Sequence, residues 1–166
     1  MPYINQNDLK NVFEYLPETG EFLRLITKSS NAVKGMITKG SKDHYGRYVL
    51  TINYKSFKAH RLAWIWMYGD IPDCKLIDHI NGDHSDNRIA NLRICTPHEN
   101  GQNKKERKTK SGYGGVEKHQ KGWRAYISFN YKKIHLGLYN TPEEAYKTHL
   151  EGKRNYHLFS PQYRDK

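Results

Sequence analysis

The chain has 166 residues, of which 36% are hydrophobic and 27% charged, and its formal net charge is +11. This length allows one domain or two small ones, and the charge favours a polyanionic partner over an acidic protein surface. Two cysteines without a CxxC pair argue against a disulfide framework and a cysteine-based zinc site. The polar first residues and the lack of a long apolar run predict neither a signal peptide nor a bilayer span, so we expect an intracellular protein.

The N-terminal part predicts a helix followed by strands. Apolar residues from Leu9 to Leu16 recur at helical spacing, and Pro17 and Gly20 would end that helix. A strand is expected over 21–26. The glycine-rich stretch 29–45 is typical of a loop or a short hairpin.

Alternating residues over 48–52 predict a strand, and Asn53-Tyr54-Lys55 is a plausible turn into a partner strand that runs to Ala59. The apolar stretch 62–67 predicts a buried helix that stops at Gly69. His60 and Arg61 precede that helix. They could contact phosphate or simply pack, and the sequence leaves both interpretations open.

A strand–loop–strand–helix pattern follows. Strands are expected over 75–80 and 92–95, joined by a loop over 81–87 that is rich in turn formers. Asp78 and His79 are neighbours on the first strand, so their side chains should face opposite sides unless the strand twists or the pocket is wide. Thr96-Pro97-His98-Glu99 has helix-start chemistry, which places Asn100 in the first turn of a helix.

Positive charge is concentrated after this pattern. Residues 100–136 contain ten Lys or Arg against two Glu, which is +8 of the +11. Such clustering favours nucleic acid, because binding releases condensed counterions, and a membrane surface is less favoured because no apolar helical face accompanies the charge. We read 104–112 as a basic linker that also touches phosphate, through Lys104, Lys105, Arg107, Lys108 and Lys110.

The last part of the chain predicts a half-buried antiparallel sheet covered by a helix. Trp123, Ala125, Ile127 and Phe129 alternate with polar residues along one strand, and a second strand covers 132–138. Thr141-Pro142-Glu143-Glu144 then begins a helix, with Thr as N-cap, Pro at N1 and Glu at N3.

The residues from His60 to Asn103, which include DHINGD, DN, NLR and EN, resemble the HNH (ββα-metal) nucleases, especially the phage and intron-encoded homing endonucleases. The resemblance implies that His79 is the general base that activates water. It implies that Asp78 and Asn100 ligate one divalent metal, and that Asn91 braces the loop and orients His79. It also places the protein in the cytoplasm of a bacterial host if the chain is phage-encoded.

The residue types suit that chemistry. Imidazole has an ordinary pKa of about 6.5, so a neutral base is available near neutral pH. Asn100 stands where many HNH nucleases have a third His, and oxygen ligands favour Mg²⁺ or Mn²⁺ over zinc. His98 is a competing ligand candidate, two residues out of register. Arg93 could reach the scissile phosphate or be an ordinary exposed strand residue.

Residues 113–159, with GV, W-x-A, LG and TPEEAY, resemble the AP-two/ethylene-response-factor DNA-binding domain. That family lays a three-stranded sheet into the major groove, which implies DNA contacts from outward side chains. The plant family has several arginines and a tryptophan on this face, and this chain differs there, so DNA binding carries over and sequence preference does not. The outward residues are His119, Lys121, Arg124, Tyr126, Ser128, Lys133 and His135.

Together these patterns predict an α+β protein, with N-terminal strands and helix leading into a ββα-metal core and then a three-stranded antiparallel sheet packed on one helix. The expected domains are 1–103, with the HNH core at about 60–103, and 113–166. The predicted activity is metal-dependent, site-preferring DNA cleavage of the HNH homing type. Double-stranded DNA is the expected partner, with no obligatory protein partner and a monomeric or dimeric state. The alternatives are a non-catalytic DNA-binding protein with a decayed HNH scaffold and an enzyme that acts on RNA.

Overall fold

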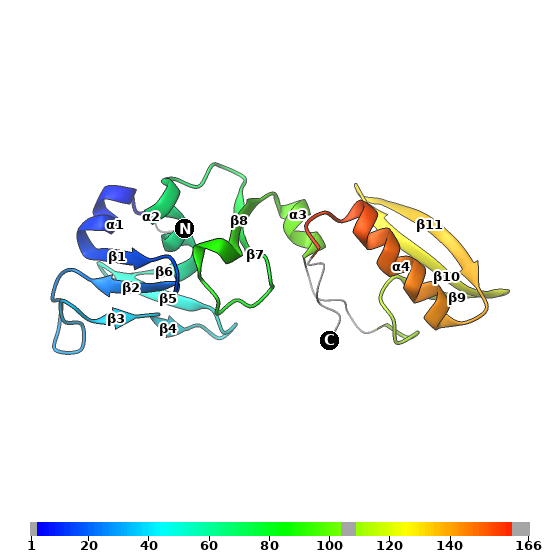
Figure 1. The fold of residues 1–166 in the computed structure, drawn as a ribbon, viewed down its shortest axis with the longest axis horizontal. Helices are drawn as coiled ribbons and strands as arrows, with labels where there is room; N and C mark the ends of the chain where they lie inside the picture. The colour runs from blue at the N-terminus through cyan, green and yellow to red at the C-terminus, as the bar shows by residue number, and fades with distance from the viewer. Residues whose placement is uncertain (1–2, 104–108, 161–166) are drawn as a thin grey trace. The chain divides into compact units, whose positions relative to one another are not determined.

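The computed structural model describes residues 3–103 and 109–160. The chain divides into two compact units, Met1–Pro97 and His98–Lys166. Both units combine helices with small antiparallel sheets, which confirms the predicted α+β class (Figure 1). No helix in the described ranges is long and apolar enough to cross a membrane.

The first helix is shorter than predicted. Helix α1 covers Gln6–Val12, and the chain then becomes strand β1, Phe13–Leu16. Phe13 is already extended, with φ −136° and ψ 140°. The prediction that the helix continues to Leu16 is therefore wrong. The reason is tertiary: Phe13 and Tyr15 alternate into the core while β1 pairs with strand β2, so packing overrides the helical spacing of the apolar residues.

Two three-stranded sheets follow from these pairings. Strand β2 covers Glu21–Arg24 and pairs with the short β3, Ile37–Thr38. Strand β4, Ser41–Lys42, pairs with β5, Tyr48–Ile52, which in turn pairs with β6, Lys55–Lys58. The stretch 29–45 thus contributes β3 and β4 to different sheets, and these two strands do not form a hairpin with each other.

The predicted turn after β5 is present. Ile52 pairs with Lys55, so Asn53 and Tyr54 form a two-residue hairpin loop. Both lie in the left-handed region, with φ 48° and 62°, which is the conformation whose twist suits a tight hairpin. The C-terminal unit repeats this turn at Asn130-Tyr131, with φ 48° and 61°.

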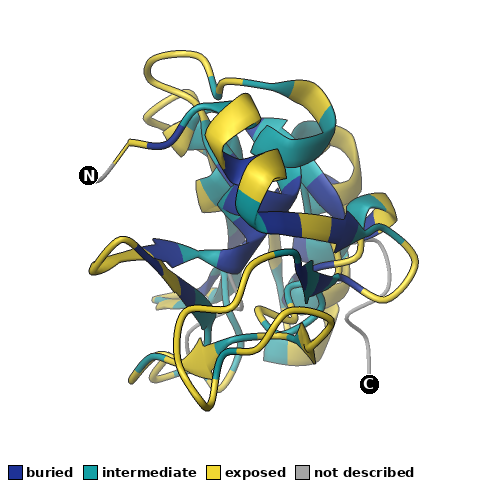
Figure 2. Cartoon of the chain, turned by 90° about the vertical axis from the view of Figure 1, so that its left-hand side faces the viewer, coloured by how far each residue is buried: buried dark blue, intermediate teal, exposed yellow. Residues whose placement is uncertain are grey.

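Helix α2, Ala59–Tyr68, crosses the N-terminal core and begins earlier than predicted, so that His60 and Arg61 lie in its first turn. Leu62 and Ala63 are fully buried on it, and Figure 2 shows the buried residues gathered where helices and strands face each other. The remaining core residues come from many parts of the unit: Ile4, Leu9, Phe13, Tyr15, Phe22, Leu50, Ile52, Phe57, Ala59, Ile77 and Leu92.

The predicted strand–loop–strand–helix pattern is also present. Strand β7 covers Leu76–His79 and pairs antiparallel with β8, Leu92–Cys95, in a sheet of two strands. A short 3₁₀ turn, Ile89–Asn91, ends the loop between them. Helix α3, Pro97–Gln102, begins directly after Thr96.

The C-terminal unit has the predicted three strands and helix. Strands β9 (Val116–His119), β10 (Gly122–Phe129) and β11 (Lys132–Tyr139) form a sheet in the order β11-β10-β9. Helix α4, Pro142–Tyr156, packs on this sheet, and its N-cap Thr141 forms a full capping box with Glu144. Val116, Ala125 and Ala145 are the buried apolar centre.

Candidate active site

His79 ends strand β7 and is buried, with 3% of its surface exposed. Its Nε2 lies 3.0 Å from Oδ1 of Asn87. An amide oxygen only accepts hydrogen bonds, so in this arrangement Nε2 carries the proton and donates it. The other ring nitrogen, Nδ1, is then the basic one. This hydrogen bond selects the tautomer with its proton on Nε2, which leaves Nδ1 as the nitrogen at which a general base accepts a proton.

Asn87 is itself held by residues far away in the sequence. It is 2% exposed, and its backbone carbonyl accepts a hydrogen bond of 2.7 Å from the Tyr15 hydroxyl. Burial raises the pKa of that hydroxyl, so it remains a donor. Gly20, with φ +73°, lies so close that an added Cβ would be 2.6 Å from the Asn87 carbonyl carbon. The turn between β1 and β2 therefore supports the loop that carries Asn87.

Asn91 braces the same loop in another way. Its Nδ2 donates to the carbonyl of Asp86 at 2.8 Å, and its Oδ1 accepts the N–H of Asn81 at 3.0 Å. Asn91 therefore ties together the two ends of the loop between β7 and β8. The side chain that bonds the His79 ring is Asn87, which the sequence interpretation treated as ordinary loop architecture. The sequence does not distinguish Asn87 from the other polar residues of this loop. Burial of its side chain in the folded protein does.

The loop is further ordered by its acidic residues. Asp83 accepts hydrogen bonds from the hydroxyl and the backbone N–H of Ser85, and these bonds lower the pKa of its carboxyl. Asp86 forms a two-pronged pair with Arg88 at 2.7 and 2.8 Å, and Arg88 lowers the pKa of Asp86. Both loop carboxylates thus stay charged well into acid.

Two further histidines lie against His79. The His60 ring centroid is 4.9 Å from that of His79, and the exposed His84 ring is 5.4 Å away. Burial and the nearby His79 lower the pKa of His60 well below its usual value, so His60 is neutral at neutral pH. The sequence left phosphate contact and packing open for His60, and in the structure its ring packs against that of His79.

Asp78 has different surroundings from His79, as strand alternation predicts. It is 6% exposed, and its Oδ2 accepts two hydrogen bonds from Arg93, at 2.9 Å from Nη2 and 3.1 Å from Nε. Arg93 is its direct cross-strand partner on β8. The arginine predicted to contact DNA therefore has an internal carboxylate partner and orients the predicted metal ligand.

The other predicted ligand, Asn100, lies in α3, on the far side of the division between the two units. Within the described ranges, no three His, Cys, Asp or Glu side chains gather to hold an ion. A metal at Asp78 would therefore need ligands of another kind. Amide oxygens and water meet that need and suit Mg²⁺ or Mn²⁺.

The predicted DNA face of the C-terminal unit carries an ion-pair network. Glu117 pairs with Lys133 at 2.7 Å and with Arg124 at 3.5 Å, and these cations lower its pKa, with Lys133 as the main cause. The Lys133 ammonium also lies 3.7 Å from the centre of the Tyr126 ring. Lys110, Lys121, Ser128 and His135 are exposed, and His119 is partly so. Lys104, Lys105, Arg107 and Lys108 lie outside the described residues.

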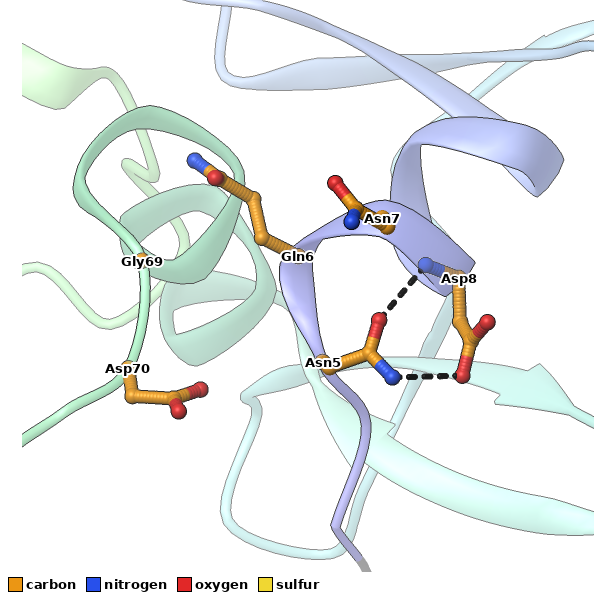
Figure 3. A pocket seen from close by; sticks show the side chains of 6 residues that line it. All are labelled: Asn5, Gln6, Asn7, Asp8, Gly69 and Asp70. Atoms are coloured by element: carbon orange, nitrogen blue, oxygen red, sulfur yellow. Dashed lines mark hydrogen bonds between the residues drawn. The ribbon is translucent and has the colours of Figure 1, made fainter.

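A surface hollow elsewhere in the N-terminal unit has a simpler explanation. It lies where the start of α1 meets the end of α2, and Figure 3 shows polar side chains around it. Asn5 there accepts the N–H of Asp8 at 2.8 Å, which caps α1. None of its lining residues belongs to the predicted site, so we assign it no role in chemistry.

Part of the chain is similar to known proteins. Residues 57–102, less than a third of the chain, match the HNH endonuclease family. Protein 3.8 of Escherichia phage T7 is 35% identical over 78 residues, which are 45% of this chain and 64% of the phage protein. A solved structure of DNA binding and cleavage by the HNH homing endonuclease I-HmuI has 22% identity and a TM-score of 0.45, over 62% of this chain and 57% of that one. The chain thus spans less than two thirds of each relative, and its residues 57–102 carry an HNH endonuclease domain.

Proposed function

We propose that the protein is a metal-dependent DNA endonuclease of the HNH homing type, which hydrolyses phosphodiester bonds with site preference. The observation that carries this proposal is the buried His79. Asn87 fixes its tautomer, and Asp78 lies beside it within the stretch that matches the HNH endonuclease family. A buried imidazole whose tautomer is selected by a hydrogen bond, next in the sequence to a carboxylate, suits proton transfer at a phosphate.

His79 is the general base of the proposed reaction. Its Nδ1 takes a proton from a water molecule, whose oxygen attacks phosphorus while the P–O bond to the leaving sugar oxygen breaks. General-base catalysis of this kind contributes roughly 10²–10⁴-fold. Asn87 keeps the proton on Nε2, and Asn91 keeps the loop closed around both groups. The loop is braced before any substrate arrives.

Asp78 and Asn100 are the proposed ligands of one Mg²⁺ or Mn²⁺ ion. A carboxylate and an amide oxygen are hard donors, which these ions prefer. When bound, such an ion stabilises the charge that develops on the phosphate and the leaving oxygen. Arg93 aligns the Asp78 carboxylate from the neighbouring strand.

Duplex DNA is the proposed partner. The net charge of +11 and the HNH match support it, and the phage relative supports action inside a bacterial cell. The proposed AP-two-like domain at 113–166 would anchor the enzyme through the outer face of its sheet, with the basic linker 104–112 on phosphate. One site per chain makes a nick the elementary event, by a monomer or by each chain of a dimer.

The test is cleavage of supercoiled plasmid with Mg²⁺, compared with chelator, for wild type, His79→Ala and His84→Ala. The proposal expects nicking that chelator abolishes and that His79→Ala reduces by roughly 10²–10⁴-fold. His84→Ala is the matched control, because it removes the exposed ring that lies near His79. If His79→Ala kept full activity and His84→Ala lost it, His84 and not His79 would be the general base.

Parallel assays on duplex DNA, single-stranded DNA and RNA identify the substrate. Binding without cleavage of any of them would favour the alternative, a DNA-binding protein on a decayed HNH scaffold. Preferential cleavage of RNA would overturn the choice of DNA. Mapping the cut ends on both strands of a fragment library then measures site preference.

A further inference from the structure

Three partly buried cations gather beside the site, at the start of α2. Val49 on β5 pairs with Lys58 on β6, so Arg47, which enters β5, lies alongside the beginning of α2. Lys58 is the N-cap of that helix, and Arg61 lies three residues later, in the first turn of the helix. His60 lies between Lys58 and Arg61 in the chain and touches the His79 ring.

Their charges act on one another and on the site. Burial lowers the pKa of Lys58, and the charges of Arg47 and Arg61 lower it further, while Asp43 opposes them. The same three cations add to the lowered pKa of His60, after burial and His79. The strand pairing and the helix start place Arg47, Lys58 and Arg61 around His60, whose ring lies against that of His79.

Few negative charges of the protein offset these three cations. Among the described residues, none of the three cations forms an ion pair. Asp43 is the carboxylate that opposes the other charges at Lys58, and its Oδ1 already accepts the N–H groups of Tyr45 and Arg47 at 2.9 Å. These cations outnumber the carboxylate, so the start of α2 carries an excess of positive charge that attracts an anion.

The helix itself adds to the excess. Helix α2 has no side-chain hydrogen bond at its N-cap and no acidic residue in its first turn. Its free N–H groups and the positive end of its dipole therefore reinforce the three cations. Acidic residues are the usual occupants of a helix N-terminus. Lys58 and Arg61 lie there instead, which suits the binding of an external anion.

We propose that Arg47, Lys58 and Arg61 form a binding site for the phosphodiester backbone of DNA next to His79. The DNA identity of the ligand rests on the function proposed above. Two arginine forks match phosphate oxygens in pairs, which a lysine-only patch would not do. Tyr45, over which Arg47 lies at 5.4 Å, is exposed beside the cluster and offers a flat face to sugar or base.

The cluster gives the N-terminal unit its own hold on DNA, independent of the C-terminal sheet. Its proximity to His79 means that the phosphate it binds lies close to the one being cut. The cluster therefore fixes the position of the cleaved strand, whereas the C-terminal unit sets where on the duplex the enzyme stands.

The test measures binding of a fluorescent DNA duplex by anisotropy over a series of salt concentrations, in the His79→Ala background and without divalent metal. Removing a phosphate contact lowers the slope of log K against log salt by about 0.9 on B-form DNA. In the triple variant Arg47→Ala, Lys58→Ala, Arg61→Ala, the magnitude of this slope should therefore be lower than in the parent by about 1 to 3. The matched control, Lys10→Ala, Lys34→Ala, Lys147→Ala, removes the same net charge elsewhere and should keep the slope within a few tenths.

Equal slopes for the two triple variants would overturn the proposal, as would an absence of DNA binding by the parent protein. Arg47→Lys with Arg61→Lys keeps the charge and guards against a folding defect, because it should retain the slope while weakening affinity severalfold. Since binding is measured without cleavage, this outcome is separate from the plasmid test. A protein that binds through the cluster and never cuts would refute the nuclease and keep the phosphate site.

Discussion

Two polar networks of this molecule, one around His79 and one around Glu117, differ in how far they are buried and should behave differently. Around His79 the partners are buried, with His79 3% and Asn87 2% exposed. Around Glu117 they are open to solvent, with the Lys133 and Glu117 side chains 50% and 37% exposed. Breaking a buried hydrogen bond costs about 1–3 kcal/mol, and an exposed ion pair is worth about 0–1 kcal/mol. The first network therefore holds one geometry, and the second can exchange partners.

This difference matches the work proposed for each unit. Proton transfer needs a base fixed to within a fraction of an ångström, which a buried network supplies. Adjustment to a DNA surface needs side chains that leave internal partners at little cost, and the Glu117 network supplies those. The following predictions, from the largest expected effect to the smallest, test this contrast.

Asp78→Ala should reduce cleavage on the order of a thousandfold, because it removes a proposed metal ligand that supplies several kcal/mol of stabilisation. DNA binding in the absence of metal should remain within a few fold. Single-turnover cleavage and anisotropy measure the two effects. If the variant bound DNA weakly but cleaved normally once bound, Asp78 would not be a metal ligand. The contrast between the buried and the exposed network would then fail as well.

Asn87→Ala should slow cleavage by roughly a hundredfold, since a loosened base loses its alignment, and should destabilise the fold by about 1–3 kcal/mol. The effect should lie in kcat and leave KM nearly unchanged. Asn87→Asp keeps an acceptor for Nε2 and should recover part of the rate. Tyr15→Phe removes the hydrogen bond to the Asn87 carbonyl and should cost about 1 kcal/mol of stability. It should slow cleavage less than Asn87→Ala does. Equal kcat for all three variants would show that His79 does not depend on this network.

The pH dependence of stability should report His60. Its folded pKa lies below the unfolded value of about 6.5, so the unfolded chain binds the proton first as the pH falls. The stabilisation is present above about pH 6.5 and is lost below it, with a slope of at most about 1.4 kcal/mol per pH unit. Urea unfolding between pH 7.5 and 5 measures this slope. His60→Gln should flatten it, and an unchanged slope in that variant would exclude His60 as the cause.

Glu117→Gln should change the free energy of unfolding by no more than about 0.5 kcal/mol, because its ion pairs are exposed to solvent. The same change releases Lys133 and Arg124 and should strengthen DNA binding severalfold at low salt. Chemical denaturation and anisotropy measure both effects. A loss of more than 2 kcal/mol would mean that the exposed network is structural and that the contrast is false.

The comparison also separates what could be predicted from the sequence from what could not. The two Asn-Tyr hairpin loops and the Thr141 capping box depend on neighbouring residues, and local chemistry predicts such features well. The strand–loop–strand–helix order around Asp78 and His79 was predicted for the same reason. The end of α1 was predicted wrongly, because Phe13 and Tyr15 follow a pairing with β2 that helical spacing does not reveal.

By itself, the sequence determined the strongly basic character of the chain, and its resemblance to HNH nucleases pointed to Asp78, His79, Asn91 and Asn100. Only the tertiary structure decided that Asn87 bonds His79, that Arg93 bonds Asp78, and that the strand pairing brings β5 alongside the start of α2. The physical reason is that polar loop residues look alike until burial distinguishes them. Burial here depends on contacts between distant parts of the chain, such as Tyr15 with Asn87.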